Sequence, residues 1–173
     1  MAYEYRFFKH LSAERRRPCN IYTRHFNGAK KIPSTEQSRL VAVSSESTQY
    51  DDEVMLELKQ NDKESYLHTA NELNNSGINL LVIEHEYGIY GGERGEYLLE
   101  LVDNLKIPFI TTLHTVLPAP DEKQRYILNM LAQRGEKIVT MANNTIDILK
   151  NTYGIDPSKI AVINHGVPSI PME

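Results

Sequence analysis

The 173-residue sequence contains no tryptophan and a single cysteine, Cys19. One cysteine cannot form an internal disulfide, and it cannot supply the several thiolates of a cysteine-based metal site. No apolar run approaches the ~20 residues that a membrane-spanning helix needs. Residues 1–17 also lack the apolar stretch of a secretory signal. We therefore expect a cytoplasmic protein without a disulfide framework.

Positive charge is scarce outside the first part of the chain. Residues 1–31 carry eight Lys or Arg against two Asp or Glu, whereas the rest carries 11 against 21. A basic arm is one signature of nucleic-acid binding. However, the acidic remainder would repel a phosphate backbone, and no nucleic-acid motif is present. A solvated loop or an anion-binding turn at Arg15, Arg16 and Arg17 explains the arm, and we expect no nucleic-acid partner.

Short apolar runs alternate with longer amphipathic stretches along most of the chain. Runs such as RLVAVS and INLLVI predict strands, whereas apolar residues spaced three or four apart predict helices. The acid-rich stretch 51–60 is also assigned to a helix. The expected strands are residues 3–11, 39–44, 78–83, 108–113, 137–141 and 160–163. The expected helices are residues 51–60, 63–73, 96–105, 121–134 and 144–153.

This alternation indicates βαβ units and therefore a parallel sheet. Because the crossovers of such units are right-handed, helices are expected on both faces of the sheet. The sequence thus predicts a doubly wound, Rossmann-like α/β domain. Residues 1–38 would add an N-terminal strand and a loop with a short helix near 18–26, residues 39–165 would form the core, and residues 166–173 would be an extended tail.

Ligands of open α/β sheets bind beyond the carboxyl ends of the strands. Three of the six histidines, His85, His114 and His165, fall just after predicted strands. A single histidine at a strand end is most often structural. Three at one edge of a sheet favour a binding or catalytic site.

Glycines gather in residues 88–95 (GIYGGERG), directly before a predicted helix. Glycine lets the backbone approach a ligand closely, and N–H groups at a helix start favour anions, so these residues could cradle a pyrophosphate. Their spacing does not give the G-x-G-x-x-G fingerprint, and Glu93 would repel a phosphate. A flexible turn is an equally good interpretation.

Other chemistries have less support. Three histidines with Glu86 could ligate the metal of a hydrolase, but no local spacing such as HExxH is present, and we expect no metal. The sequence contains no GxSxG nucleophile elbow. Cys19 could act as a nucleophile beside a histidine, although an inert thiol is the better expectation.

Several segments form a specific combination: 85–92 (HEYGIYGG), 111–117 (TTLHTVL), 124–125 (QR) and 165–168 (HGVP). Together they resemble the retaining family 4 glycosyltransferases of the GT-B fold, over about residues 50–171. Enzymes of this family have two Rossmann-like domains that face each other across a cleft. The resemblance implies that this chain is the N-terminal domain, which mainly holds the acceptor.

The resemblance also implies roles for individual residues. His114 would lie near the donor sugar and is the candidate catalytic residue. A nucleotide-sugar would be the co-substrate of the full enzyme, and no cofactor or metal is implied. The residues expected to line the substrate cleft are His85, Glu86, Tyr87, Gly88, Gly91, Gly92, Thr115, His165 and Gly166.

Two departures from the family pattern affect the expected function. The segment matching HGVP normally leads into a C-terminal domain that carries most of the donor site, including paired glutamates separated by seven residues. Here the sequence stops at Glu173, so we expect this chain alone to lack transferase activity. In addition, Asn20 stands where the family has a glycine, in a loop where backbone normally approaches a ligand.

We therefore expect the N-terminal domain of a retaining glycosyltransferase that moves a sugar from a nucleotide-sugar to a glycan or lipid-linked acceptor. No membrane contact is evident from the sequence. The alternative is a non-catalytic module of the same fold that binds a glycan or docks onto another protein. Tyr87, Tyr90 and Tyr97 would suit stacking on sugars, although Tyr97 would equally suit a helix face directed at the core.

Overall fold

The computed structural model describes residues 5–10, 39–45, 50, 52 and 54–164, and for residues 5–10 it describes the backbone. Several predictions lie outside these residues. They concern the basic arm at 15–17, Cys19, Asn20, the short helix near 18–26, His165 and Gly166.

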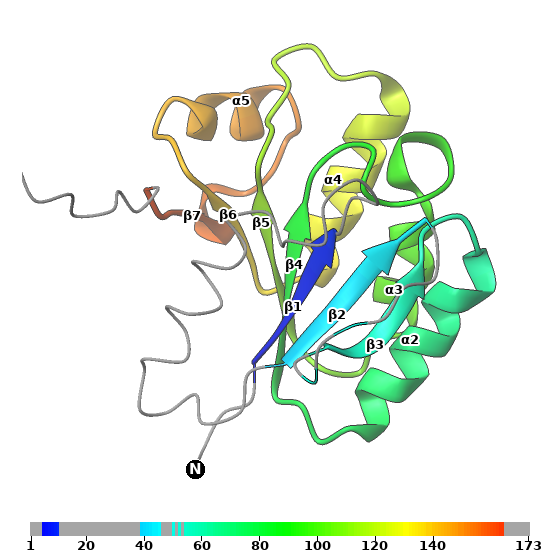
Figure 1. The fold of residues 1–173 in the computed structure, drawn as a ribbon. Coiled ribbons are helices and arrows are strands. Elements are labelled where there is room, and N and C mark those ends of the chain that lie inside the picture. Colours follow the sequence, from blue (N-terminus) through cyan, green and yellow to red (C-terminus); the bar gives the residue numbers. More distant parts are fainter. Residues whose placement is uncertain (1–4, 11–38, 46–49, 51, 53, 165–173) are drawn as a thin grey trace, which may run out of the picture.

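In the described part of the chain, seven strands form one sheet in the order β3-β2-β1-β4-β5-β6-β7 (Figure 1). Every neighbouring pair is parallel, so every connection crosses over, as in βαβ units. The chain direction across the sheet reverses between β1 and β4, which makes this the topological switch point. The strands are β1 (Tyr5–His10), β2 (Arg39–Ser44), β3 (Val54–Lys59), β4 (Leu80–His85), β5 (Phe109–Leu113), β6 (Lys137–Thr140) and β7 (Ile160–Val162).

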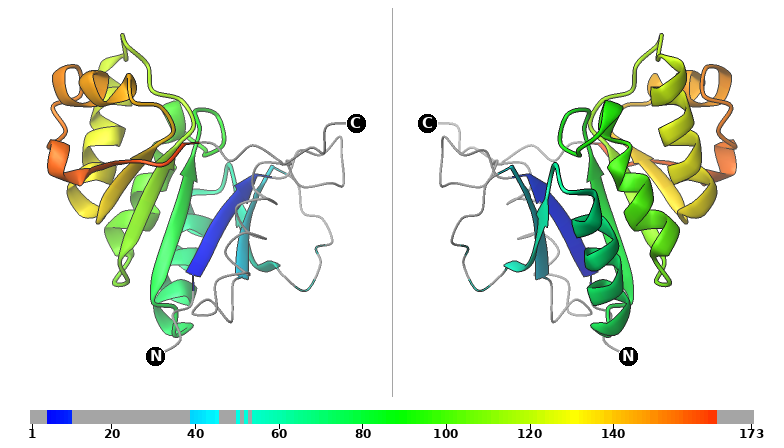
Figure 2. Two further views of the ribbon diagram at one scale, coloured as in Figure 1. Left: turned by 90° about the vertical axis from the view of Figure 1, so that its left-hand side faces the viewer. Right: turned by 90° about the vertical axis from the view of Figure 1, so that its right-hand side faces the viewer.

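The longer helices lie side by side on one face of the sheet, with α2 against α3 and α3 against α4 (Figure 2). Consecutive residues of β4 point to opposite faces, and 81–85 are all buried, so both faces of the sheet centre are covered. The expected Rossmann-like parallel sheet is confirmed. None of the described helices is long and apolar enough to cross a membrane. The α-helices are α2 (Lys63–Asn75), α3 (Tyr97–Asn104), α4 (Glu122–Arg134) and α5 (Thr145–Asn151), and two 3-10 helices span Glu93–Gly95 and Pro157–Lys159.

Side-chain caps begin α2 and α4, within one residue of the helix starts expected at residues 63 and 121. The Asp62 carboxylate accepts a hydrogen bond from the backbone N–H of Glu64 at 3.1 Å and caps α2. Asp121 and Gln124 form a reciprocal capping box at the start of α4, with bonds of 2.8 and 2.9 Å. These bonds satisfy backbone N–H groups that have no partner within the helix.

The helix expected at residues 51–60 is wrong, because this stretch contains strand β3. Strand β3 pairs with β2, and the pairing shifts between Leu40 and Val41, leaving Met55 as an extra residue. Such a β-bulge interrupts the two-residue alternation that marks a strand in a sequence. Only Leu56 and Leu58 then alternate cleanly with polar neighbours, and the preceding acids resemble a first helical turn.

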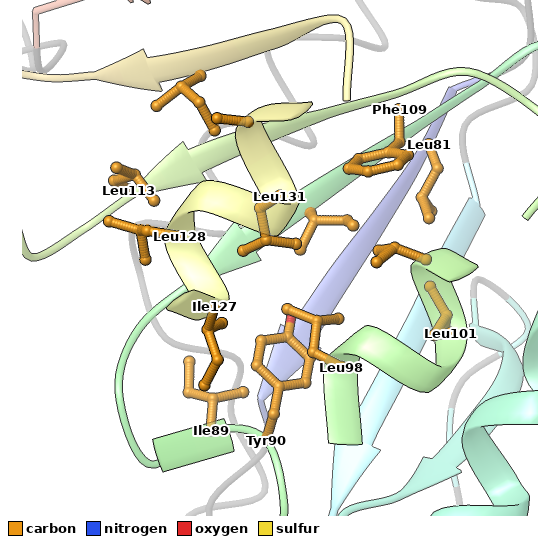
Figure 3. Packing of buried hydrophobic residues seen from close by; sticks show 14 of the residues in the cluster. Leu81, Ile89, Tyr90, Leu98, Leu101, Phe109, Leu113, Ile127, Leu128 and Leu131 are labelled. Atoms are coloured by element: carbon orange, nitrogen blue, oxygen red, sulfur yellow. The ribbon is translucent and has the colours of Figure 1, made fainter. Parts of the chain in front are cut away.

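The hydrophobic core lies between the sheet and this helical layer (Figure 3). It also includes two residues of the loop that follows β4, Ile89 and Tyr90, which are 9% and 2% exposed. The loop is therefore packed onto the core rather than projecting from it. Core side chains from β4, β5, α3 and α4 include Leu81, Leu98, Leu101, Phe109, Leu113, Ile127, Leu128 and Leu131.

Candidate functional site

The candidate site lies at the carboxyl ends of β4 and β5, beside the switch point. His85 and Leu113 are the last residues of these strands and are partners in register. The backbone N–H of His114 donates to the carbonyl of His85 at 3.0 Å, which extends the pairing by one residue. The backbones of the two histidines therefore lie side by side at the carboxyl ends of neighbouring strands, the edge at which the sequence places them.

Glu84 and His114 form a buried pair at this edge. Glu84 Oε2 lies 2.8 Å from His114 Nε2, and their side chains are 2% and 11% exposed. Leu81 and Ile83 of β4 belong to the core under the helices, so Glu84 points to the opposite face of the sheet. Sequence reasoning did not select Glu84 as a site residue. The available signal was an acid inside an otherwise apolar strand, which is rarely buried without a partner.

Glu86 joins the loops that follow the two strands. Its Oε1 accepts from the backbone N–H of Tyr87 at 2.9 Å, and its Oε2 accepts from the Thr115 hydroxyl at 2.7 Å. The structure therefore brings together two of the predicted substrate-binding residues, Glu86 and Thr115. Both are half-buried, and their mutual bond holds the loop after β4 to the loop after β5.

His85 occupies a different environment from His114. Its side chain points into the helix-covered face, is 1% exposed, and lies edge-on to Tyr87 at 5.2 Å and stacked on Tyr90 at 6.3 Å. Burial, and secondarily the charge of His114, lower the pKa of His85 to about 4. The imidazole is therefore neutral at pH 7, and its Nδ1 is buried without a hydrogen-bond partner in the described part of the chain. A direct ligand contact for His85 stays a prediction, and it would require this side chain to become exposed.

The three tyrosines near the site, Tyr87 and Tyr90 in the loop and Tyr97 at the start of α3, contact other parts of the protein. Tyr90 donates from its hydroxyl to the carbonyl of Glu84 at 3.0 Å. Tyr87 is half-buried, and burial together with the nearby Tyr153 hydroxyl raises the pKa of Tyr87 far above its usual value. Tyr97 packs edge-on against Tyr66, with ring centroids 5.9 Å apart. These contacts favour the core-facing interpretation of Tyr97 over a sugar-stacking one.

The glycine-rich loop is anchored by the protein itself. The backbone N–H of Gly91 donates to the Tyr66 hydroxyl at 2.9 Å, and that hydroxyl donates to the carbonyl of Gln60 at 2.9 Å. Gln60 also donates from its side-chain amide to the carbonyl of Gly88 at 2.8 Å. The loop is therefore clamped to the turn between β3 and α2, which disfavours the flexible-turn interpretation. Gly92 is exposed and adopts a positive φ of 78°.

The surroundings of the loop are unfavourable for a phosphate. Arg94 is paired with Asp121 at 2.6 Å, and Lys123 is paired with Glu96. An open depression of about 520 Å³ beside the loop is lined by three acids, one lysine and one tyrosine. The amide of Gly91 is already occupied and these charges are paired or negative, so nothing here supports the pyrophosphate cradle. The lining residues are Glu93, Asp121, Glu122, Lys123 and Tyr126.

The residues that the structure describes do not form a metal site. No group of three or more His, Cys, Asp or Glu side chains there is placed to hold an ion.

Of the predicted site residues, Glu86, Tyr87, Gly88, His114 and Thr115 gather at the ends of β4 and β5. Gly91 and Gly92 lie further along the loop, towards α2.

Comparisons with known proteins point to one class. The family described as Glycosyltransferase Family 4 matches residues 94–169, which is less than half of the chain and includes His114 and Thr115. The structure is similar to that of a glycosyltransferase from Rickettsia africae ESF-5, with a TM-score of 0.62 and 18% sequence identity. The similarity covers 96% of this chain and 44% of that protein's chain. No curated protein matches the chain.

These findings define a Rossmann-like α/β fold of the type found in glycosyltransferases. At 18% identity the structural similarity shows the fold alone, and the family match adds support for a glycosyltransferase-like function. The chain spans less than half the length of the solved glycosyltransferase that it matches.

Proposed function

We propose that the chain is the acceptor-side, N-terminal domain of a retaining GT-B glycosyltransferase. In this proposal it binds a glycan or a lipid-linked acceptor and completes the site for a nucleotide-sugar held mainly by a second domain. The family match to residues 94–169 and the fold of the Rickettsia africae protein support this proposal.

The observation that carries the proposal is the Glu84–His114 pair at the carboxyl edge, beside the switch point. This is where open α/β sheets bind ligands. A histidine held by a buried carboxylate provides an oriented polar group, and the Glu86–Thr115 bond holds the two surrounding loops. Such a site suits the recognition of hydroxyl groups, which both donate and accept hydrogen bonds.

The chemistry assigned to this chain is positioning. Glycosyl transfer depends on holding acceptor and donor in a reactive geometry and on stabilising developing charge. In the proposal, His114 contacts the donor sugar, and the residues around Glu86 orient the acceptor. The charges around the glycine-rich loop are paired or negative, so the proposal assigns the donor's diphosphate to the second domain and expects this chain alone to be inactive.

The test is chemical-shift mapping on the ¹⁵N-labelled chain with neutral oligosaccharides, and separately with nucleotide-sugars. The proposal expects saccharide-induced shifts at residues 84–88 and 112–116, weak binding of nucleotide-sugars, and no turnover. His114→Gln should weaken saccharide binding, whereas His68→Gln should not, because His68 is an exposed residue of α2. Tight nucleotide-sugar binding, turnover by this chain, or shifts confined to another surface would contradict the proposal.

The second candidate is a non-catalytic glycan-binding or protein-docking module. The clamped glycine-rich loop favours it, because the Gly91 amide of that loop is already bound to the Tyr66 hydroxyl and the Gly88 carbonyl to the Gln60 side chain. The two candidates differ in whether nucleotide-sugar affects saccharide binding. A transferase domain should bind the saccharide more tightly when a nucleotide-sugar is added at high concentration, whereas a simple module should not respond.

A further inference from the structure

We propose that Gln60 is a positioning residue for the candidate site. Its side-chain amide holds the turn of residues 86–89, and through this turn it orients the Glu86 carboxylate that binds Thr115. That a saccharide meets Glu86 and Thr115 rests on the proposed function. The orientation of Glu86 does not, because it follows from contacts within the chain.

The backbone of Gln60 is fixed at both of its hydrogen-bonding groups. Its N–H donates to the carbonyl of Ser44, the last residue of β2, at 2.8 Å. Its carbonyl accepts from the hydroxyl of Tyr66 at 2.9 Å, and the Tyr66 side chain is fully buried. The side chain of Gln60 therefore starts from a rigid position, which is what a positioning role requires.

The side-chain amide of Gln60 holds one peptide group of the loop after β4. It donates to the carbonyl of Gly88 at 2.8 Å, and because a carbonyl only accepts, the amide nitrogen must face it. The N–H of the same peptide group belongs to Ile89, and it donates to the carbonyl of Glu86 at 3.3 Å to close a turn. Gly88 has a φ of 89°, as the third residue of a type II turn requires. This peptide group is therefore bonded at both its C=O and its N–H.

The same turn sets the direction of the Glu86 carboxylate. Oε1 accepts from the N–H of Tyr87, the second residue of the turn, at 2.9 Å. Oε2 accepts from the Thr115 hydroxyl at 2.7 Å. The last residue of the turn, Ile89, packs into the core (Figure 3). A rotation of the peptide groups between these two ends would move the Tyr87 N–H and turn the carboxylate away from Thr115, and the bond from Gln60 opposes that rotation.

The test compares ¹⁵N-labelled variants with the wild-type chain at pH 7.5 and without any ligand. Gln60→Glu has nearly the same shape, but its carboxylate is ionised and donates no hydrogen bond. We expect the amide of Ile89 to exchange with solvent about fivefold faster, as for one lost hydrogen bond, and the amide resonances of Tyr87 and Thr115 to shift. Gln60→Lys keeps a donor and should retain the wild-type exchange rate and resonances.

Two further variants separate this role from other effects. Gln133→Glu makes the same change on the exposed surface of α4 and should alter none of these signals. Gln60→Ala removes the donor without adding charge, and it should reproduce the effect of Gln60→Glu. The resonance of Thr115 is decisive because Thr115 lies on the loop after β5, so its shift distinguishes positioning from a local structural role.

Changes confined to residues 59–66 and 88–91, or equal changes in Gln60→Lys and Gln60→Glu, would overturn the inference. So would a Gln60→Ala variant with the wild-type spectrum. In the saccharide titration, Gln60→Glu should weaken binding about fivefold and Gln60→Lys should not. Absence of saccharide binding by the wild-type chain would contradict the proposed function, while the ligand-free comparison would still decide the role of Gln60.

Discussion

Gly91 lies directly against the backbone carbonyl of Gln60, so that a Cβ added to Gly91 would come within 1.9 Å of the carbonyl oxygen. The same Cβ would lie 2.9 Å from the ring of Tyr97. Glycine at this position therefore allows a loop from one side of the switch point to touch the turn after β3. The close approach is between two parts of the protein, and no ligand is needed to explain the glycine.

We expect Gly91→Ala to lower the free energy of unfolding by about 3 kcal/mol or more, because backbone rather than a flexible side chain must move. Urea unfolding followed by circular dichroism measures this. Gly88→Ala is the control, since Gly88 has a φ of 89° with open space around its Cα. It should lose about 1–2 kcal/mol from backbone strain alone. Equal stabilities of the two variants would contradict the contact.

Tyr66→Phe should destabilise the protein by about 1–3 kcal/mol, because it removes a buried hydroxyl that has two partners. That hydroxyl accepts from Gly91 N–H and donates to the carbonyl of Gln60. Tyr126→Phe is the matched control, because Tyr126 is 54% exposed and should change stability by less than about 0.5 kcal/mol. The same urea titration measures both variants. A Tyr66→Phe variant with the free energy of unfolding of the wild type would contradict the proposed anchoring.

His85 should make stability depend on pH. Its pKa is about 4 in the folded chain against 6.5 as the ordinary value. Between these values the unfolded chain binds a proton that the folded chain does not, so stability falls as pH falls from about 6.5 towards 4. The shift corresponds to roughly 3 kcal/mol.

The matched variants for this prediction are His85→Leu and His68→Gln. His85→Leu should remove most of the slope of stability against pH between pH 4 and 6.5. It should change the free energy of unfolding little at pH 7.5, because the Nδ1 of His85 has no hydrogen-bond partner among the described residues. His68→Gln should keep the wild-type slope. Thermal unfolding at several pH values between 4.5 and 7.5 measures it, and an unchanged slope in His85→Leu would contradict the assignment.

Arg94 is the one non-glycine residue with a positive φ in the part of the chain that the structure describes, at 58°. Glycine adopts this conformation at no steric cost, so Arg94→Gly should be more stable than Arg94→Ala by about 1 kcal/mol. Both variants lose the exposed ion pair with Asp121, which cancels in the comparison. At Gln133, within α4, the order should invert and Ala should be more stable than Gly. The same order at both positions would contradict the prediction.

Much of the fold follows from local patterns. The alternation of strands and helices predicts the parallel sheet, and Asp62 and Asp121 mark the starts of α2 and α4 because capping is a local interaction. The exception is β3, where pairing with β2 outweighs the local pattern. The bulge at Met55 and the acidic residues before Val54 make this strand resemble a helix in the sequence. Its assignment as a strand depends on its pairing with β2.

The site is predictable in position but not in its contacts. Strand ends place His85 and His114 at one edge, yet the two side chains fall on opposite faces, and only one is paired with a carboxylate. That difference depends on the strand register, which a single sequence does not contain. Likewise, a glycine such as Gly91 signals a close backbone approach without saying whether the neighbour is a ligand or the protein.

Strand β1 has a consequence for the order in which the chain folds during synthesis. In the described sheet it alone joins β2 and β3 to the remaining strands, through pairs with β2 on one side and β4 on the other. Although β1 precedes the other described strands in the sequence, it cannot be flanked on both sides until the residues of β4 that pair with it, Leu80 to Val82, have emerged from the ribosome. Parallel pairing offers no nearby hairpin partner in the meantime. Until then β1 stays incompletely paired, and this interval is where chaperone binding or misassembly would act.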